Sequence, residues 1–389
     1  MLNAGSRWLP ALLTAMVALG PLSTDLYLPA LPSIATALAV DQGKAQLTLS
    51  VFLVGFAAGQ LVYGPLSDRL GRRGPLVTGL ALYVVGGVAC MLATTIEILI
   101  LARFLQALGA CAGPVLARAV VRDVYGRNRA AAILAYMAAA MAVAPMVGPA
   151  IGGAIEIALG WRATFALLVA YGGLGLVGIV ALLPETSPGP SGHSYFNAFL
   201  VLLRHRHYLG YMLAATFTYS GIFAFLSASS FVLIGSLKLT PDRYGLAFGL
   251  VVVGYILGTM TTGRFGARIG NLRMLKAGIG LCLFGGGSML ALALAQPPAV
   301  VAVLVPMMIY LAGAGLVLPN AMAGAIGPFP SLAGAALALM GFVQMTVAAL
   351  LGAVVGQFEQ TSAVVMAAAI TGMALLLAIS VAVLVRGES

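Results

Sequence analysis

Apolar runs of about 20 residues follow one another along the whole chain, and each is long enough to cross a hydrocarbon core about 30 Å thick. Charged residues make up 8% of the 389 residues, whereas a soluble domain carries roughly 25%. A transmembrane β-barrel would instead show alternating segments of about 10 residues. The pattern therefore predicts an all-α, polytopic membrane protein.

Twelve transmembrane spans can be placed along the sequence. They cover approximately residues 8–28, 46–66, 76–94, 98–117, 131–155, 163–183, 208–234, 244–263, 274–295, 300–320, 333–356 and 363–385. The first span could be mistaken for a signal peptide. Its apolar stretch is longer than the roughly 7–15 residues of a signal h-region and contains Asp25, so we expect it to stay as a first helix.

The basic residues fall on alternate loops. With the N-terminus placed inside, fifteen of the twenty Lys and Arg residues lie on cytoplasmic segments. The four outer ones are Lys44, Arg162, Lys238 and Arg243, and the remaining one, Arg103, is inside a span. This asymmetry follows the positive-inside rule and predicts that both termini are cytoplasmic. The same alternation argues against nucleic-acid binding, although the net charge is +10.

The longest hydrophilic break, residues 185–207, separates six spans from six. Its first part is rich in Pro, Gly and Ser, as in a linker. We therefore expect an N-terminal bundle over 1–184 and a C-terminal bundle over 208–389. Within the linker, an amphipathic segment at 195–203 is either a helix on the membrane surface or a plain connector.

A weak repeat relates the two halves at an offset of 199 residues, because residues 64–73 align with 263–272. The matched positions are Gly64, Arg69 and Gly71 against Gly263, Arg268 and Gly270. The same offset places Ala224 opposite Asp25 and Ala302 opposite Arg103, so the second half lacks these charges. Two related bundles facing a cavity near the membrane midplane are a common architecture of secondary transporters.

Asp25 is the only acidic residue between Trp8 and Leu28. A carboxylate at that depth costs roughly 2.5 kcal/mol or more, so it is a candidate functional group. Arg103 lies at a similar depth in span four, which makes a contact with Asp25 feasible, either direct or through water. The alternative is a static buried pair or a helix cap near Pro21 and Pro29.

Three short motifs carry a family resemblance. GPLSDRLGRR (64–73), RFLQALGACAG (103–113) and APMVGPAIGG (144–153) resemble motifs A, B and C of the major facilitator superfamily, the last of which marks antiporters. Taken singly, the first could be a positive-inside loop and the third a kinked helix with a small-residue face. The motif residues are Gly64, Asp68, Arg69, Gly71, Arg72 and Arg73, then Arg103, then Pro145, Gly148, Pro149, Gly152 and Gly153.

The resemblance narrows to the bicyclomycin-resistance group of drug:proton antiporters, near the chloramphenicol and florfenicol exporters. It is carried by STDLYLPALP (23–32), VRDVYG (121–126), TYSGIFAFLSASSFVLI (218–234) and NAMAGAI (320–326). It implies a monomeric exporter of small amphipathic drugs in the bacterial cytoplasmic membrane, with membrane lipid around it. Protons would be the coupling ion, with no cofactor and no metal.

The resemblance also implies roles for individual residues. Asp25 and Arg103 would take part in proton coupling. Asp68 would meet the start of span eleven, and Arg72 would pair with Asp123, which locks the cytoplasmic side while the protein faces outward. Candidate substrate-cavity residues, chosen because aromatic, Met and amide side chains suit varied ligands, are Tyr27, Gln60, Met137, Met141, Phe217, Phe223, Tyr255, Asn320 and Gln344.

Other functions are disfavoured to different degrees. A membrane prenyltransferase would need paired Asp-rich motifs and an ATP-driven pump a phosphate-binding loop, and the sequence contains neither. We therefore expect a transporter and not an enzyme. An exporter of a metabolite such as an amino acid or sugar stays open, as does a membrane sensor that does not transport.

Overall fold

The computed structural model describes residues 8–125, 127–186, 195–295, 299–358 and 363–385, and within these ranges it is helical with no strand. Eleven of the described helices are long and apolar enough to cross a membrane, and a bent helix pair at the N-terminal end makes twelve if it is one span. The predicted all-α, polytopic class is confirmed.

The first span is broken into short pieces. It consists of α1 (Trp8–Val17), α2 (Leu19–Asp25), a 3-10 turn (Leu28–Ala30) and α3 (Leu31–Ala37), with a bend of 42° after α1. It therefore extends to residue 37 and not to 28 as predicted. The reason is that Pro29 and Pro32, which end a helix that precedes them, also suit the first turn of the next helical piece.

The other helices of the first half run a few residues beyond most of the predicted span ends. They are α4 (Gln42–Leu70), α5 (Arg73–Leu92), α6 (Ile96–Val124), α7 (Arg127–Leu159) and α8 (Trp161–Leu182). Polar residues at the ends support the extra turns. For example, the Asp41 side chain accepts a hydrogen bond from the Lys44 backbone N–H at 2.7 Å and caps α4.

The second half begins with α9 (Tyr195–Leu203), so the amphipathic linker segment is a helix, and it packs against α10 and α14. The helices that follow are α10 (Arg206–Ser230), which continues as a π-helical segment over Phe231–Ser236, α11 (Pro241–Ile269), α12 (Asn271–Ala295), α13 (Val300–Ile326), α14 (Ala333–Val355), preceded by a 3-10 turn at Pro330–Leu332, and α15 (Ala363–Leu384).

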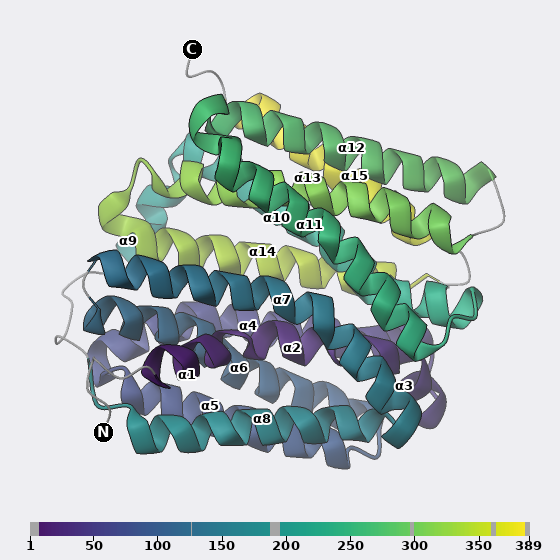
Figure 1. The fold of residues 1–389 in the computed structure, drawn as a ribbon, viewed down its shortest axis with the longest axis horizontal. Helices are drawn as coiled ribbons and strands as arrows, with labels where there is room; N and C mark the ends of the chain where they lie inside the picture. Colours follow the sequence, from purple (N-terminus) through teal and green to yellow (C-terminus); the bar gives the residue numbers. More distant parts are fainter. Residues whose placement is uncertain (1–7, 126, 187–194, 296–298, 359–362, 386–389) are drawn as a thin grey trace.

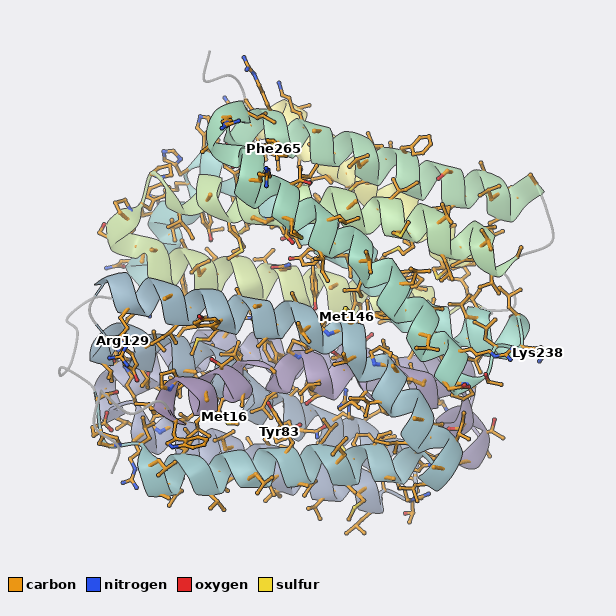
Figure 2. All side chains as sticks on the ribbon, in the orientation of Figure 1. Met16, Tyr83, Arg129, Met146, Lys238 and Phe265 are labelled. Atoms are coloured by element: carbon orange, nitrogen blue, oxygen red, sulfur yellow. The ribbon has the colours of Figure 1, made fainter. Side chains whose placement is uncertain are left out.

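Figure 1 shows helices α1–α8 in the lower part of the molecule and α10–α15 in the upper part, with their long axes roughly parallel. The two groups meet where α7 packs on α11 and where α4 packs on α14. We call the end of the molecule with the turns at 70–73 and 269–271 the terminal face, because α1 begins and α15 ends there (Figure 1). The other end is the opposite face. Arg129 marks the terminal face and Lys238 the opposite face in Figure 2.

The α7–α11 interface is tight toward the opposite face. There a Cβ on Gly153 would strike the Pro241 carbonyl, and a Cβ on Gly245 would strike the backbone of Ala150. Toward the terminal face the two helices diverge (Figure 1), and the Met260 side chain of α11 is 65% exposed. The halves are therefore held together mainly at the opposite face.

Candidate functional site

Asp25 lies at the last residue of α2, where the helical path of the first span is interrupted. Its side chain is 2% exposed and accepts a hydrogen bond from the Thr24 hydroxyl at 3.2 Å. The break and the burial together place a carboxyl group inside the protein, beside α7 and close to the second half of the chain. The structure thus confirms the prediction that Asp25 is an acidic residue buried within the first span.

Motif C is the surface on which Asp25 rests. A Cβ on Gly148 would stand 3.0 Å from the Asp25 Cβ, and a Cβ on Gly152 would strike the Leu26 carbonyl. The next glycine, Gly153, faces Pro241 of α11 instead. The small residues of α7 therefore join the broken first span on one side to α11 on the other, and α7 remains helical through Pro145 and Pro149.

Gly152→Ala should disrupt the packing of α7 against Leu26 of the first span. Because the new methyl group would strike backbone atoms of Leu26 that cannot move aside, we expect the protein to lose about 1–3 kcal/mol of stability. The matched control is Gly173→Ala in α8, where no protein atom lies within 4 Å of the added Cβ. That change should stabilise the helix slightly. Thermal unfolding of both purified variants measures the difference, and equal midpoints would contradict the packing argument.

Two tyrosines of the second half complete the surroundings of Asp25. Tyr219 in α10 and Tyr244 in α11 lie near enough to Asp25 for their hydroxyl groups to interact electrostatically with its carboxyl group. Tyr244 also shares a hydrogen bond of 2.9 Å with the Ser229 hydroxyl. Sequence reasoning missed both tyrosines, because nothing local in the sequence indicates that they meet a residue some 200 positions away.

Arg103 is fully buried inside the first half, and it is held by aromatic rings. Its guanidinium carbon lies 4.2 Å from the ring centre of Phe52, 4.7 Å from that of Tyr27 and 5.8 Å from that of Phe165. Its Nη1 donates a hydrogen bond of 2.8 Å to the Gln106 side-chain oxygen, while Nε and Nη2 have no hydrogen-bond partner. Three such cation–π contacts stabilise a desolvated guanidinium.

The direct Asp25–Arg103 contact is not formed. Among the described residues the ion pairs are those of Arg72 with Asp68 and Asp123, and Arg103 is in neither. The two side chains have different neighbours, because the break in the first span directs Asp25 toward α7 and the second half. What links them is Tyr27, two residues after Asp25, which stacks on Arg103 and shares a hydrogen bond of 2.7 Å with the Thr48 hydroxyl.

Gln106 is a further residue that sequence reasoning missed. A signal for it exists, since residues three apart lie on the same side of a helix. Arg103 and Gln106 have this spacing within an otherwise apolar stretch. A buried polar pair at that spacing predicts a hydrogen bond between the two side chains.

Motif A forms a charge cluster at the terminal face. Arg72 donates hydrogen bonds from Nε to Asp123 at 2.8 Å and from Nη1 to Asp68 and to the Ser67 hydroxyl. The predicted Arg72–Asp123 pair is therefore confirmed. Burial alone would lower the pKa of Arg72, and the two carboxylates more than offset this, so its pKa is raised above the ordinary value. A contact of Asp68 with the start of α14 stays a prediction.

Glu185 joins this cluster from the start of the linker. Its carboxylate accepts hydrogen bonds from the backbone N–H groups of Arg72 at 2.7 Å and Arg73 at 3.2 Å, at the first turn of α5. Gly71 permits this approach, because its φ of 88° is unfavourable for other residues and a Cβ there would strike the carboxylate. Sequence reasoning assigned Glu185 only to the linker, although an acid on a basic face was a usable signal.

Removing the Arg72 side chain should loosen the terminal face. Arg72→Ala leaves two half-buried carboxylates without their cation, and we expect a loss of roughly 1.5–3 kcal/mol of stability. Thermal unfolding in detergent measures this loss of stability. The matched control is Arg69→Ala, an exposed neighbour in the same motif. A fall of the same size in both variants would show that the cluster has no special role.

The substrate-cavity candidates fall into two groups. Tyr27, Met137, Phe223 and Asn320 are buried by protein contacts, whereas Gln60, Met141, Phe217, Tyr255 and Gln344 are half-buried. Gln60 and Gln344 lie on the two helices of the α4–α14 contact, and the Gln60 amide packs against Gly341, one turn before Gln344. A role of these residues in substrate binding stays a prediction.

Comparison with known proteins agrees with this geometry. The profile of the Major Facilitator Superfamily matches residues 13–353. The chain is 32% identical over 365 residues to the "Uncharacterized MFS-type transporter YdgK" of Bacillus subtilis (strain 168), covering 92% of this chain and 90% of the relative. It is 29% identical over 357 residues to the "Bicyclomycin resistance protein homolog" of Haemophilus influenzae, with 89% and 88% covered.

The fold agrees with a solved structure as well. The crystal structure of a D-xylose-proton symporter superposes with a TM-score of 0.76 at 16% identity, covering 96% of this chain and 97% of the symporter. The helical fold and the charged, proline- and glycine-rich contacts within it thus define a polytopic membrane transporter, and not an enzyme. The chain belongs to the major facilitator superfamily, and relatives named for antibiotic resistance place it beside the drug:proton antiporter group.

Proposed function

We propose that this protein is a proton-coupled exporter of small amphipathic compounds that works by alternating access. It would act as a monomer in the bacterial cytoplasmic membrane, with its terminal face in the cytoplasm and with no cofactor besides the proton. One observation carries the proposal, namely that Asp25 is buried where the first span meets α7, α10 and α11. A group in that position senses whether the two halves are packed together or apart.

The coupling follows from the cost of burying a charge. With the α7–α11 interface closed at the opposite face, Asp25 is out of water, and an ionised carboxylate there is costly whereas a protonated carboxyl is tolerated. Protonation from outside would therefore favour the arrangement described here. Release of the proton to the cytoplasm would then favour separation of the interface, and substrate would leave to the outside.

Arg103 would couple movement of the first span to the other helices of the first half. Its guanidinium is fixed between Phe52, Phe165 and Tyr27, and Tyr27 moves with Asp25 because only Leu26 separates them. A shift of the broken helix would exchange one set of cation–π contacts for another. The second half has Ala224 and Ala302 at the positions of Asp25 and Arg103 at the repeat offset, so it would act as the mechanical partner.

Reconstituted proteoliposomes test the proposal. Radiolabelled chloramphenicol and bicyclomycin should move against their gradients when an opposing pH gradient is imposed, and the movement should stop with a protonophore. Movement of amino acids or sugars but of neither drug would favour a metabolite exporter. Absence of counterflow with every compound would favour a membrane sensor and overturn the proposal.

A further inference from the structure

A pocket lies at the terminal face, and its described lining residues all belong to the second half. It has a volume of about 910 Å³, and its walls come from the start of α10, the α11–α12 turn and the ends of α13 and α15. None of the described residues of the first half lines it. It is therefore separate from Asp25 and from the contacts between the halves, and the proposed transport cycle gives it no role.

The charges around this pocket have one sign. Arg273 and Lys276 lie on consecutive turns of α12, and His205 and His207 face them from the start of α10. No acidic residue is present among the described residues that line it. A concave surface with clustered cations attracts anions, so the chemistry of the pocket points to a negatively charged ligand.

In the first half, the equivalent position of the internal repeat binds a carboxylate. In the first half, the turn from α4 to α5 passes through Gly71, and the exposed N–H groups at the start of α5 bind the Glu185 carboxylate at 2.7 and 3.2 Å. A helix N-terminus favours negative charge through its N–H groups and its dipole. The first half thus supplies its own anion.

Among its described residues, the second half keeps the glycine turn and has no carboxylate at the corresponding place. Gly270, which aligns with Gly71, has the same φ of 88°. α12 starts at Asn271, directly after Gly270, and α5 starts one residue later relative to Gly71, at Arg73. At Gly71 a Cβ would strike Glu185, whereas at Gly270 no described residue other than its immediate chain neighbours comes within 4 Å of the Cβ position. The repeat offset of 199 residues places Leu384 opposite Glu185, and the neighbouring Val385 lines the pocket.

We propose that this pocket binds the phosphate of an anionic phospholipid headgroup. The N–H groups at the start of α12, Arg273 and Lys276 would hold the phosphate where the first half holds Glu185. A lipid is the source favoured by the surroundings, because apolar Ile269 and Leu272 adjoin the cations and α12 continues with exposed Leu281 and Phe284 toward the membrane core. Basic pockets between helix ends are known headgroup sites.

Binding of fluorescent phosphatidylglycerol to the full chain in phosphatidylcholine nanodiscs tests the proposal. Each cation should contribute roughly fivefold to affinity, so Arg273→Gln with Lys276→Gln should weaken binding roughly thirtyfold. Arg264→Gln removes an exposed cation of the same face outside the pocket and should change affinity little. Equal losses in the double variant and in this control would overturn the site, since they would reflect net charge alone.

A second variant supplies an internal anion. Val385→Glu places a carboxylate in the pocket, as Glu185 does in the first half, and should reduce phosphatidylglycerol binding without removing a cation. Its thermal unfolding in pure phosphatidylcholine establishes that it is folded. Inorganic phosphate should compete only weakly. Competition by phosphate at the strength of the lipid would overturn the lipid as the source and favour a soluble phosphate compound, and unchanged lipid binding by folded Val385→Glu would overturn the pocket.

Discussion

Asp25→Asn is expected to abolish drug movement driven by a pH gradient. Burying a charged side chain at this depth costs roughly 2.5 kcal/mol. This free energy corresponds to a factor of roughly 70 in the equilibrium between the closed and open arrangements. The Asn side chain has the same shape, so it fits against Gly148 and still accepts the hydrogen bond from Thr24. Transport is lost because the side chain no longer changes charge, while the packing is kept.

Two measurements separate loss of coupling from loss of folding. Drug counterflow between equal pH values should persist in Asp25→Asn, because exchange of drug for drug needs no net proton movement. The matched control is Asp41→Asn, since Asn also caps helices well and Asp41 lies at the opposite face, away from the α7–α11 interface. Uphill transport by Asp25→Asn at the wild-type rate would remove this residue from the mechanism.

Local patterns predicted much of the fold. Apolar runs predicted the spans for two reasons. A helix in lipid makes all its backbone hydrogen bonds within itself, and it needs about 20 apolar residues to cross the hydrocarbon core. The motif A cluster was equally accessible, since Asp68 and Arg72 are one helical turn apart and the resemblance supplied Asp123. Such features depend on spacing along the chain, or on the family, and not on how distant helices rotate against one another.

The surroundings of Asp25 and Arg103 were not accessible in this way. Depth in the membrane follows from position along a span, and it predicts a similar level for both side chains. The direction of each side chain depends on the rotation of its helix, and the bend of 42° in the first span changes that rotation. Tyr219 and Tyr244 were missed for the same reason, because each comes near Asp25 through packing between elements far apart in sequence.

Arg103→Met should separate a coupling role from a structural one. An unbranched apolar side chain fits between Phe52, Tyr27 and Phe165, and replacing a buried charge that lacks a carboxylate partner is often neutral or stabilising. Thermal stability should therefore stay within about 2 kcal/mol of the wild type, since that is the size of the cation–π contacts given up. Transport should fall, because a methionine cannot make the cation–π contact with the Tyr27 ring that Arg103 makes.

The expected fall in transport driven by a pH gradient is roughly 30-fold, the factor that about 2 kcal/mol of lost cation–π energy represents. Arg103→Lys keeps the charge without the planar group and should lie between the wild type and Arg103→Met. Arg122→Met, on the exposed last turn of the same helix, is the matched control and should transport normally. If Arg103→Met unfolded early and yet transported at the wild-type rate per folded molecule, Arg103 would be a packing residue, and Asp25 would couple to the second half without it.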